Sequence, residues 1–384
     1  MAHGEPEQLG ARLDEESART LPPAEELASR FPRTGEVTPL SEQQWQQCMS
    51  DLKFGSQFSE HMAAATWTPQ AGWHDLQIKP YGPLSVSPAA SVLHYGQEIF
   101  EGMKAYRHAD GSVWTFRPGY NAARFNDSAD RMAMPRMDPE DFVASLVALV
   151  RADQRWVPTE PGTALYLRPF MFASEGFLGV RSAHEFTYLV IASPVGPYFT
   201  NGFAPVSIWV TRKYHRAGPG GTGAAKTGGN YASSLLPQAE ASERGFEQVC
   251  FLDAATAQNL EELGGMNVFV VGRDGRIRTP KLTGTILAGG TRSAILTLLR
   301  EDGYDVSEET IPLEELVADI QSGKVQEMFA CGTAAVVAPI GRLGSEEFDL
   351  HLPSTTVTTK IYERLTAIQN GTAEDTHGWM YRIL

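Results

Sequence analysis

A run of proline and glycine near the middle of the chain, Ser193-Pro194-Val195-Gly196-Pro197, most strongly limits the folds open to this sequence. Such runs are typical of domain boundaries, and 384 residues exceed the usual size of a single hydrophobic core. The sequence predicts a mixed α/β protein of two domains, each with a mixed or antiparallel sheet and flanking helices. We expect a partly flexible N-terminal arm at 1–39, a small domain at 40–192, a linker at 193–202 and a large domain at 203–384.

The first half of the chain carries short apolar runs that predict an antiparallel sheet. Ala109-Asp110-Gly111-Ser112 separates two of these runs and predicts a hairpin turn. Asp138-Pro139-Glu140 is typical of a helix start, and the apolar spacing after it predicts a helix over roughly 139–153. Further strands are expected at 164–168 and 186–191.

The second half alternates strands with helices. Arg273-Asp274-Gly275-Arg276 predicts a second hairpin turn. We expect strands at 206–210, 248–252, 268–271 and 336–337, and helices at 231–243, 292–299 and 358–369.

The charge and cysteine content exclude several classes of protein. A net charge of −14 without a basic cluster disfavours nucleic acid and anionic membrane as partners. No apolar stretch is long enough to span a bilayer, and residues 1–16 resemble no targeting signal. Cys48, Cys250 and Cys331 form no C-x-x-C pair, which favours a reducing compartment, and we expect a cytoplasmic protein. The histidines show no metal-ligand spacing.

Lys226 lies among glycines in the segment 223–231, which ends at Tyr231, and Glu262 follows farther along the chain. An unprotonated lysine can bind an aldehyde covalently, and glycines let a flat ring approach the backbone. A phenol can bind the ring's oxygen, and an ionised carboxylate can keep a pyridine nitrogen protonated. These three side chains predict a pyridoxal 5′-phosphate site.

Two other interpretations of this segment stay open at this point. The glycines are also typical of a surface loop whose lysine is merely solvated. Residues 220–227 nearly match the nucleotide-binding pattern G-x-x-x-x-G-K-[ST], with Ala225 where glycine is required, and Asp253 ends a strand as a magnesium ligand would. Gly228 and Gly229 would weaken the helix that this pattern needs.

Other segments offer groups for a phosphate and a substrate. Gly290 and Thr291 precede an apolar helix, whose free N–H groups suit a phosphate, although a plain glycine turn is the alternative. Arg124 lies on a predicted helix and could neutralise a phosphate. Arg168 shares a strand face with Tyr166.

Taken in order, these motifs closely resemble those of the branched-chain amino-acid aminotransferases, which are class IV, fold-type IV enzymes dependent on pyridoxal phosphate. The resemblance covers roughly residues 40–384, and the segments that carry it are 94–97, 100–104, 165–169, 226–231, 261–267, 290–292 and 332–334.

The resemblance implies a cofactor at the domain interface and a role for each candidate residue. Lys226 would bind the cofactor aldehyde and carry a proton, while Tyr231 and Glu262 keep the roles given above. The phosphate would be held by Arg124, Gly290, Thr291 and Thr333, and the substrate by Phe54, Tyr95, Phe100, Tyr166, Arg168, Gly265, Thr333, Ala334 and, from the second subunit of a homodimer, Leu178 and Val180.

The expected reaction is amino transfer from L-leucine, L-isoleucine or L-valine to 2-oxoglutarate, which gives branched-chain 2-oxo acids and L-glutamate. A D-amino-acid aminotransferase, an aminodeoxychorismate lyase and a catalytically silent cofactor-binding protein are the alternatives. Ala335 and Ala338 stand where some family members carry a C-x-x-C switch, so thiol regulation of that kind is not expected. Gly265 replaces a threonine of some members, which removes a hydroxyl contact.

Overall fold

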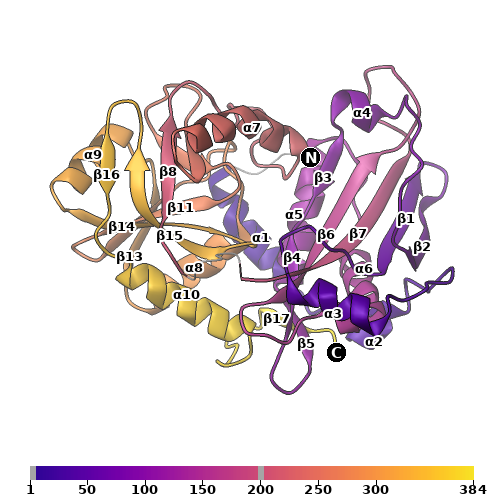
Figure 1. The fold of residues 1–384 in the computed structure, drawn as a ribbon. Helices are drawn as coiled ribbons and strands as arrows, with labels where there is room; N and C mark the ends of the chain where they lie inside the picture. The colour runs from indigo at the N-terminus through magenta and orange to yellow at the C-terminus, as the bar shows by residue number, and fades with distance from the viewer. Residues whose placement is uncertain (1–5, 198–202) are drawn as a thin grey trace. The chain divides into compact units, whose positions relative to one another are not determined.

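The computed structural model describes residues 6–197 and 203–384, which form two compact units (Figure 1). Unit 1 contains residues 6–14 and 203–366, and unit 2 contains residues 15–197 and 367–384. The chain therefore enters unit 1, builds unit 2, returns to unit 1 and ends in unit 2. No described helix is both long enough and apolar enough to span a bilayer.

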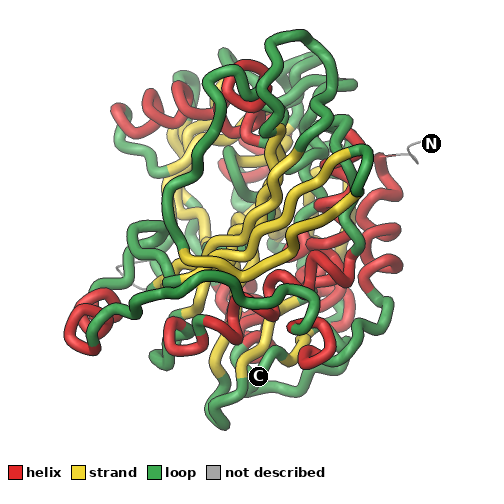
Figure 2. The backbone as a smooth tube through the Cα atoms, turned by 90° about the vertical axis from the view of Figure 1, so that its right-hand side faces the viewer, coloured by secondary structure: helices red, strands yellow, loops and turns green. Residues whose placement is uncertain are grey.

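Unit 2 is built on an antiparallel sheet whose long strands lie side by side in Figure 2. The strand order is β17-β5-β4-β6-β7-β1-β2, and β3 pairs with β6. Its strands are β1 (His61–Thr68), β2 (Gly72–Pro80), β3 (Glu98–Phe100), β4 (Met103–Arg107), β5 (Val113–Phe116), β6 (Ala164–Ala173), β7 (Phe186–Val195) and β17 (Met380–Arg382). The helices are α2 (Ala24–Ala28), α3 (Glu42–Ser50), α4 (Ser91–Tyr95), α5 (Pro118–Arg131) and α6 (Pro139–Ala152), with a 3-10 turn at Gln154–Trp156.

The hairpin and the helix start predicted from local sequence in unit 2 are present in the structure. Strands β4 and β5 form the expected hairpin, and the Asp110 carboxylate accepts hydrogen bonds from the Ser112 amide and hydroxyl in its turn. Helix α6 begins at Pro139, with the Asp138 side chain accepting the Glu140 amide at 2.8 Å. Its apolar residues are buried in the core of this unit.

The domain boundaries differ from those predicted. Strand β7 runs to Val195 inside the expected linker, because Ser193 and Pro194 continue its pairing with β6. Residues 198–202 of that linker lie outside the described residues. The expected arm is partly core, since Leu27 and Phe31 are buried with the apolar residues of unit 2. The last residues also belong to unit 2, because β17 pairs with β5.

Unit 1 is built on a mixed sheet of nine strands among the described residues. The order is β10-β9-β8-β15-β14-β11-β12-β13, and β16 pairs with β15. Its strands are β8 (Val206–Thr211), β9 (Gln248–Leu252), β10 (Leu260–Leu263), β11 (Asn267–Gly272), β12 (Arg276–Pro280), β13 (Asp305–Glu309), β14 (Val325–Gly332), β15 (Val336–Gly344) and β16 (Asp349–His351). The helices are α7 (Gly228–Glu243), α8 (Gly290–Glu301), α9 (Leu313–Gln321) and α10 (Thr356–Gln369), of which α10 continues past the unit's last residue, and α1 (Leu9–Ser17) begins here after a 3-10 turn at Pro6–Gln8.

The four strands and three helices predicted for this half lie within observed elements, whereas β10, β13, β14, β16 and α9 were not predicted. The predicted turn at 273–276 connects the antiparallel strands β11 and β12. Helix α7 begins at Gly228 rather than at Tyr231, so both glycines lie in its first turn. Helix α8 likewise begins two residues early, at Gly290. In both cases glycine, a poor helix former, adopts a helical conformation in the first turn because the surrounding structure holds it there.

Candidate active site

Lys226 lies two residues before helix α7, and its side chain reaches the first turn of that helix. The Lys226 Nζ donates a hydrogen bond to the Tyr231 hydroxyl at 2.7 Å, and it lies 5.1 Å from the centre of the Tyr231 ring. Gly265 is also close, since a Cβ built there would lie 3.5 Å from this ring. An amine and a phenol in direct contact can hold an aldehyde and an adjacent ring oxygen together.

The loop before Lys226 is fixed by the buried amide of Asn230, which sequence reasoning did not single out. The Asn230 Nδ2 donates to the carbonyl oxygens of Thr222 and Ala225 at 2.9 and 2.8 Å, and the Thr222 hydroxyl donates to Asn230 Oδ1 at 2.7 Å. On the other side, a Cβ at Gly223 would lie 2.6 Å from the carbonyl carbon of Thr285. These contacts hold the loop against its neighbours and so orient Lys226.

Glu262 lies on β10 with 3% of its surface exposed. One carboxylate oxygen pairs with Arg216 and accepts the Leu287 amide at 2.9 Å, and the other accepts the Asn267 side-chain amide at 3.3 Å. Burial raises the pKa of Glu262, while the positive charge of Arg216 acts to lower it. A carboxylate held by a guanidinium and two amides can face a protonated pyridine nitrogen.

Arg216 is a second residue of this group that sequence reasoning missed. It is buried, and its Nη2 also donates to the carbonyl oxygens of Gly223 and Thr285 at 2.8 and 2.9 Å. It therefore connects Glu262 to the loop before Lys226 and to the segment that leads toward α8. No local sequence pattern marks this arginine as a site residue, because its partners Glu262 and Thr285 are distant in sequence.

The start of α8 has the form of an anion site. A Cβ at Gly289 would overlap the Asn267 side-chain oxygen, so glycine is required at this turn. Gly290 and Thr291 are the first residues of the helix, where backbone N–H groups and the positive end of the helix dipole meet. The Arg292 side chain donates instead to the Pro280 carbonyl oxygen at 2.9 Å and pairs with Glu308.

Thr333 and Ala334 lie in the tight turn between β14 and β15. The turn ends at Val336, whose φ of 63° is a left-handed conformation that a β-branched residue rarely adopts. Such a conformation costs of the order of 1–3 kcal/mol and is held in place by the structure around it. The strain is concentrated next to two residues of the candidate set.

In unit 2, four of the predicted substrate residues lie together. The Arg168 guanidinium donates to the Tyr166 hydroxyl at 3.0 Å and lies 4.8 Å from the centre of the Phe100 ring. The Phe54 ring meets the Tyr166 ring edge to face at 4.8 Å. The Arg168 Nε is buried with no hydrogen-bond acceptor among the described residues. These residues place three aromatic rings beside the positive charge of Arg168.

Arg124, on α5, is held by a carboxylate that sequence reasoning did not mark. Its Nε and Nη2 donate to the two oxygens of Glu101 at 2.8 and 2.7 Å, and Asn121 donates to the same carboxylate at 2.7 Å. Glu101 is fully buried. This two-point contact fixes the plane of the Arg124 guanidinium.

The residues predicted to reach a second subunit form an exposed apolar group in unit 2. The Tyr95 hydroxyl donates to the Leu178 carbonyl oxygen, which ties α4 to the loop at 177–180. Leu178 and Val180 expose 59% and 87% of their surface.

Unit 1 thus combines an amine beside a phenol, a buried carboxylate and a helix start that requires glycine. These groups fit the aldehyde, the ring and the phosphate of pyridoxal phosphate. Across residues 6–197 and 203–384, no group of three or more His, Cys, Asp or Glu side chains is placed to hold a metal ion.

Comparison with known proteins identifies the family of this chain. Residues 98–343 match the model of the family described as amino-transferase class IV. The chain is 49% identical over 349 residues to a probable branched-chain-amino-acid aminotransferase of Streptomyces coelicolor, and the match covers 90% of this chain and 96% of that protein. It is 46% identical to the branched-chain-amino-acid aminotransferase of Mycolicibacterium smegmatis, and that match covers 92% of this chain and 98% of that protein.

Among solved structures, the T.th. branched-chain amino acid aminotransferase with pyridoxamine 5′-phosphate superposes with a TM-score of 0.68. The two sequences are 25% identical, and the match covers 84% of this chain and 99% of that one. This agreement argues against the nucleotide-binding interpretation of residues 220–227. The chain belongs to the class IV aminotransferases, within the group of branched-chain-amino-acid aminotransferases.

Proposed function

We propose that the protein transfers the amino group of L-leucine, L-isoleucine or L-valine to 2-oxoglutarate, with pyridoxal 5′-phosphate as its cofactor. The observation that carries the proposal is the 2.7 Å contact between Lys226 Nζ and the Tyr231 hydroxyl, in the same unit as the buried Glu262. The names of the relatives at 49% and 46% identity support the substrate class. The pyridoxamine 5′-phosphate of the solved relative supports the cofactor.

Each candidate residue of unit 1 has its own proposed role at the cofactor. Pyridoxal phosphate supplies an electron sink that weakens the bond to the substrate's α-hydrogen. Lys226 would bind the aldehyde and would carry the proton of the substrate α-carbon. Tyr231 would orient the ring through its hydroxyl, and Glu262 would keep the ring nitrogen protonated. The amides of Gly290 and Thr291 and the Thr333 hydroxyl would hold the phosphate, and Arg124 keeps its predicted role as a phosphate ligand.

The residues of unit 2 select the substrate. Phe54, Phe100 and Tyr166 supply an apolar wall for a branched side chain, and Arg168 supplies a cation for the distal carboxylate of glutamate. The amides of Thr333 and Ala334 bind the α-carboxylate, and Gly265 leaves room beside Tyr231. Tyr95 stays assigned to the same side-chain pocket. We further propose that the protein is a cytoplasmic homodimer and that Leu178 and Val180 act at the subunit contact.

The test is the visible absorption spectrum of the purified protein, recorded before and after L-leucine is added without a keto acid. We expect the band of the bound cofactor to move to the shorter wavelength of the aminated cofactor. D-alanine should leave the band in place, and a shift with D-alanine alone would transfer the assignment to the D-amino-acid alternative.

The matched variants are Lys226→Ala and Lys324→Ala, the second at a lysine whose side chain is 77% exposed. Lys226→Ala should abolish turnover, and Lys324→Ala should keep the wild-type rate. Turnover near the wild-type rate in Lys226→Ala would refute the proposed role of this lysine.

A further inference from the structure

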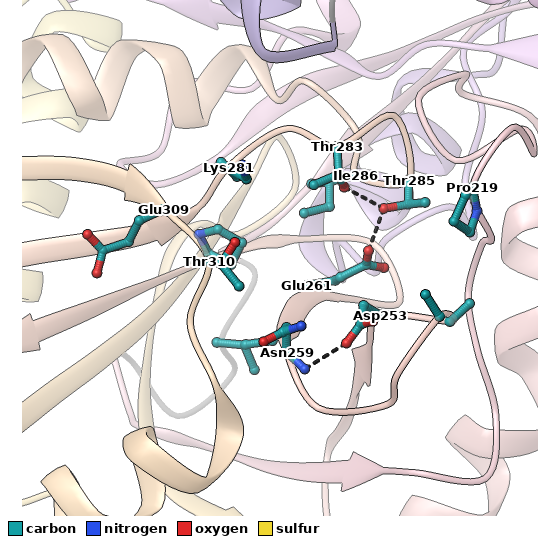
Figure 3. Close-up of a pocket in the computed structure, with 14 residues that line it drawn as sticks. Pro219, Asp253, Asn259, Glu261, Lys281, Thr283, Thr285, Ile286, Glu309 and Thr310 are labelled. Carbon is teal, nitrogen blue, oxygen red and sulfur yellow. Dashed lines mark hydrogen bonds between the residues drawn. The ribbon is translucent and has the colours of Figure 1, made fainter.

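A cavity of about 220 Å³ lies in unit 1 beside strand β10 (Figure 3). Glu261, the residue next to Glu262, lines it. Its volume is below the roughly 300–1,000 Å³ of pockets that hold drug-sized ligands, so only a small molecule fits. Most of the wall is apolar and comes from Pro219, Ala254, Ala255, Leu260, Pro280 and Ile286.

Most of the charged groups around the cavity are already engaged. The Asp253 carboxylate accepts the amides of Thr256, Gln258 and Asn259. Glu309 accepts hydrogen bonds from Arg276 and Ser307. Lys281 pairs with Glu7 at 2.8 Å.

Glu261 differs from these groups because only one of its oxygens accepts a hydrogen bond from the described residues. The side chain is buried, with 5% of the residue exposed. The Thr285 hydroxyl donates to Oε1, as Figure 3 shows, while none of the described residues donates to Oε2. Burial raises the pKa of Glu261, while the Thr285 hydrogen bond and the nearby charges of Arg216 and His215 act to lower it. Because Arg216 is already paired with Glu262, Glu261 has no ion-pair partner of its own among the described residues, and a cation in the cavity would favour its ionised form.

We propose that this cavity binds a small alkylammonium ion. An N⁺–H group would donate to Glu261 Oε2 and balance the carboxylate that Arg216 does not pair with. The short alkyl group would lie against the proline, alanine, leucine and isoleucine side chains of the wall. This ligand matches both the carboxylate oxygen and the apolar surface around it.

Glu261 in the cavity is connected to Glu262 through Thr285 and Arg216. The Thr285 hydroxyl donates to Glu261, and the Thr285 carbonyl oxygen accepts Arg216, which pairs with Glu262. A cation at Glu261 adds positive charge near this pair and favours the ionised form of Glu262. Binding therefore also shifts the pH dependence of the cofactor's absorption band, a second effect that rests on the proposed function.

The test is isothermal titration of the holoenzyme with N,N-dimethylethylammonium chloride. A tertiary amine carries one N⁺–H group but forms no imine, so it cannot react with the cofactor aldehyde. We expect saturable binding at about millimolar concentration, weakened about tenfold or more in Glu261→Gln, because a hydrogen bond to a charged group is lost. Glu309→Gln is the matched control and should keep the wild-type affinity.

A second variant, Ala254→Leu, fills the cavity and should abolish binding even if Glu261→Gln fails to fold. The proposal fails if no saturable heat is found, if Glu261→Gln or Ala254→Leu binds as the wild type does, or if potassium chloride gives the same heat. Binding does not require catalysis, so Lys226→Ala should bind the probe unchanged. The result for the cavity proposal can therefore be distinguished from a failure of the proposed reaction.

Discussion

Arg216 offers the most direct test of how the buried Glu262 carboxylate is held. In Arg216→Met, Glu262 loses its ion-pair partner, and the carbonyl oxygens of Gly223 and Thr285 lose a donor. Removing one partner of a buried ion pair costs about 3–5 kcal/mol, and each buried carbonyl left without a donor adds about 1–3 kcal/mol. Protonation of Glu262, whose pKa burial already raises, recovers part of this cost. We expect a net loss of about 3–5 kcal/mol in the unfolding free energy.

The assay is urea unfolding of the cofactor-free protein, with Glu262→Gln and the double variant completing a mutant cycle. We expect a coupling energy of about 2 kcal/mol, because the neutral glutamine no longer needs the guanidinium. The loss in Arg216→Met should also shrink as the pH falls. A carboxyl with a raised pKa in the folded state stabilises below its unfolded pKa and loses that contribution as the pH rises through the raised value. A loss under about 1 kcal/mol with no coupling would refute this reasoning.

Three further predictions concern a partly buried lysine, a closely packed glycine and a helix cap. Burial lowers the pKa of Lys104 to about 8. Between pH 8 and the pKa of this lysine in the unfolded chain, the unfolded chain binds more protons than the folded one, so stability rises with pH. In urea unfolding, the stability difference between wild type and Lys104→Met should change by about 3 kcal/mol over this pH range, and a constant difference would contradict the prediction. Gly223→Ala should lose activity about 100-fold because its Cβ meets the Thr285 backbone, and wild-type kinetics would show that this close approach is unimportant. Gly229→Ala, at a position in α7 where no atom beyond its chain neighbours and the helix's own backbone lies within 4 Å of the added Cβ, should gain about 0.5–1 kcal/mol in unfolding free energy. Asp138→Ala should lower the thermal midpoint, because removing this N-cap of α6 costs about 1 kcal/mol, and an unchanged midpoint would contradict the capping role.

Features fixed by neighbouring residues could be predicted from the sequence. The α6 start depends on Asp138 and Pro139, and the β4–β5 hairpin depends on a turn of four residues. Lys226 and Tyr231 could be selected because glycines mark the approach of a flat ring, and Tyr231 is only five positions after Lys226. In each case the physical cause lies within one turn or one loop.

Features fixed by distant partners could not be predicted in this way. Arg216 and Glu101 are ordinary charged residues in the sequence, and only the fold shows that each holds another candidate residue, Glu262 and Arg124 respectively. The proline and glycine run predicts a domain boundary, yet pairing with β6 extends β7 through Ser193 and Pro194. Tertiary hydrogen bonds overrode local propensity in this segment.

The return of β17 to unit 2 has a consequence for how the chain is made on the ribosome. Met380 to Arg382 pair with Phe116 to Trp114, so the outer edge of β5 stays unpaired until residues far later in the chain have been synthesised. At roughly 5–20 residues per second, this wait is of the order of ten seconds or more. An unpaired strand edge is prone to aggregation during that time. The nascent protein therefore passes through an interval in which unit 2 is largely formed but its sheet is still open at one side.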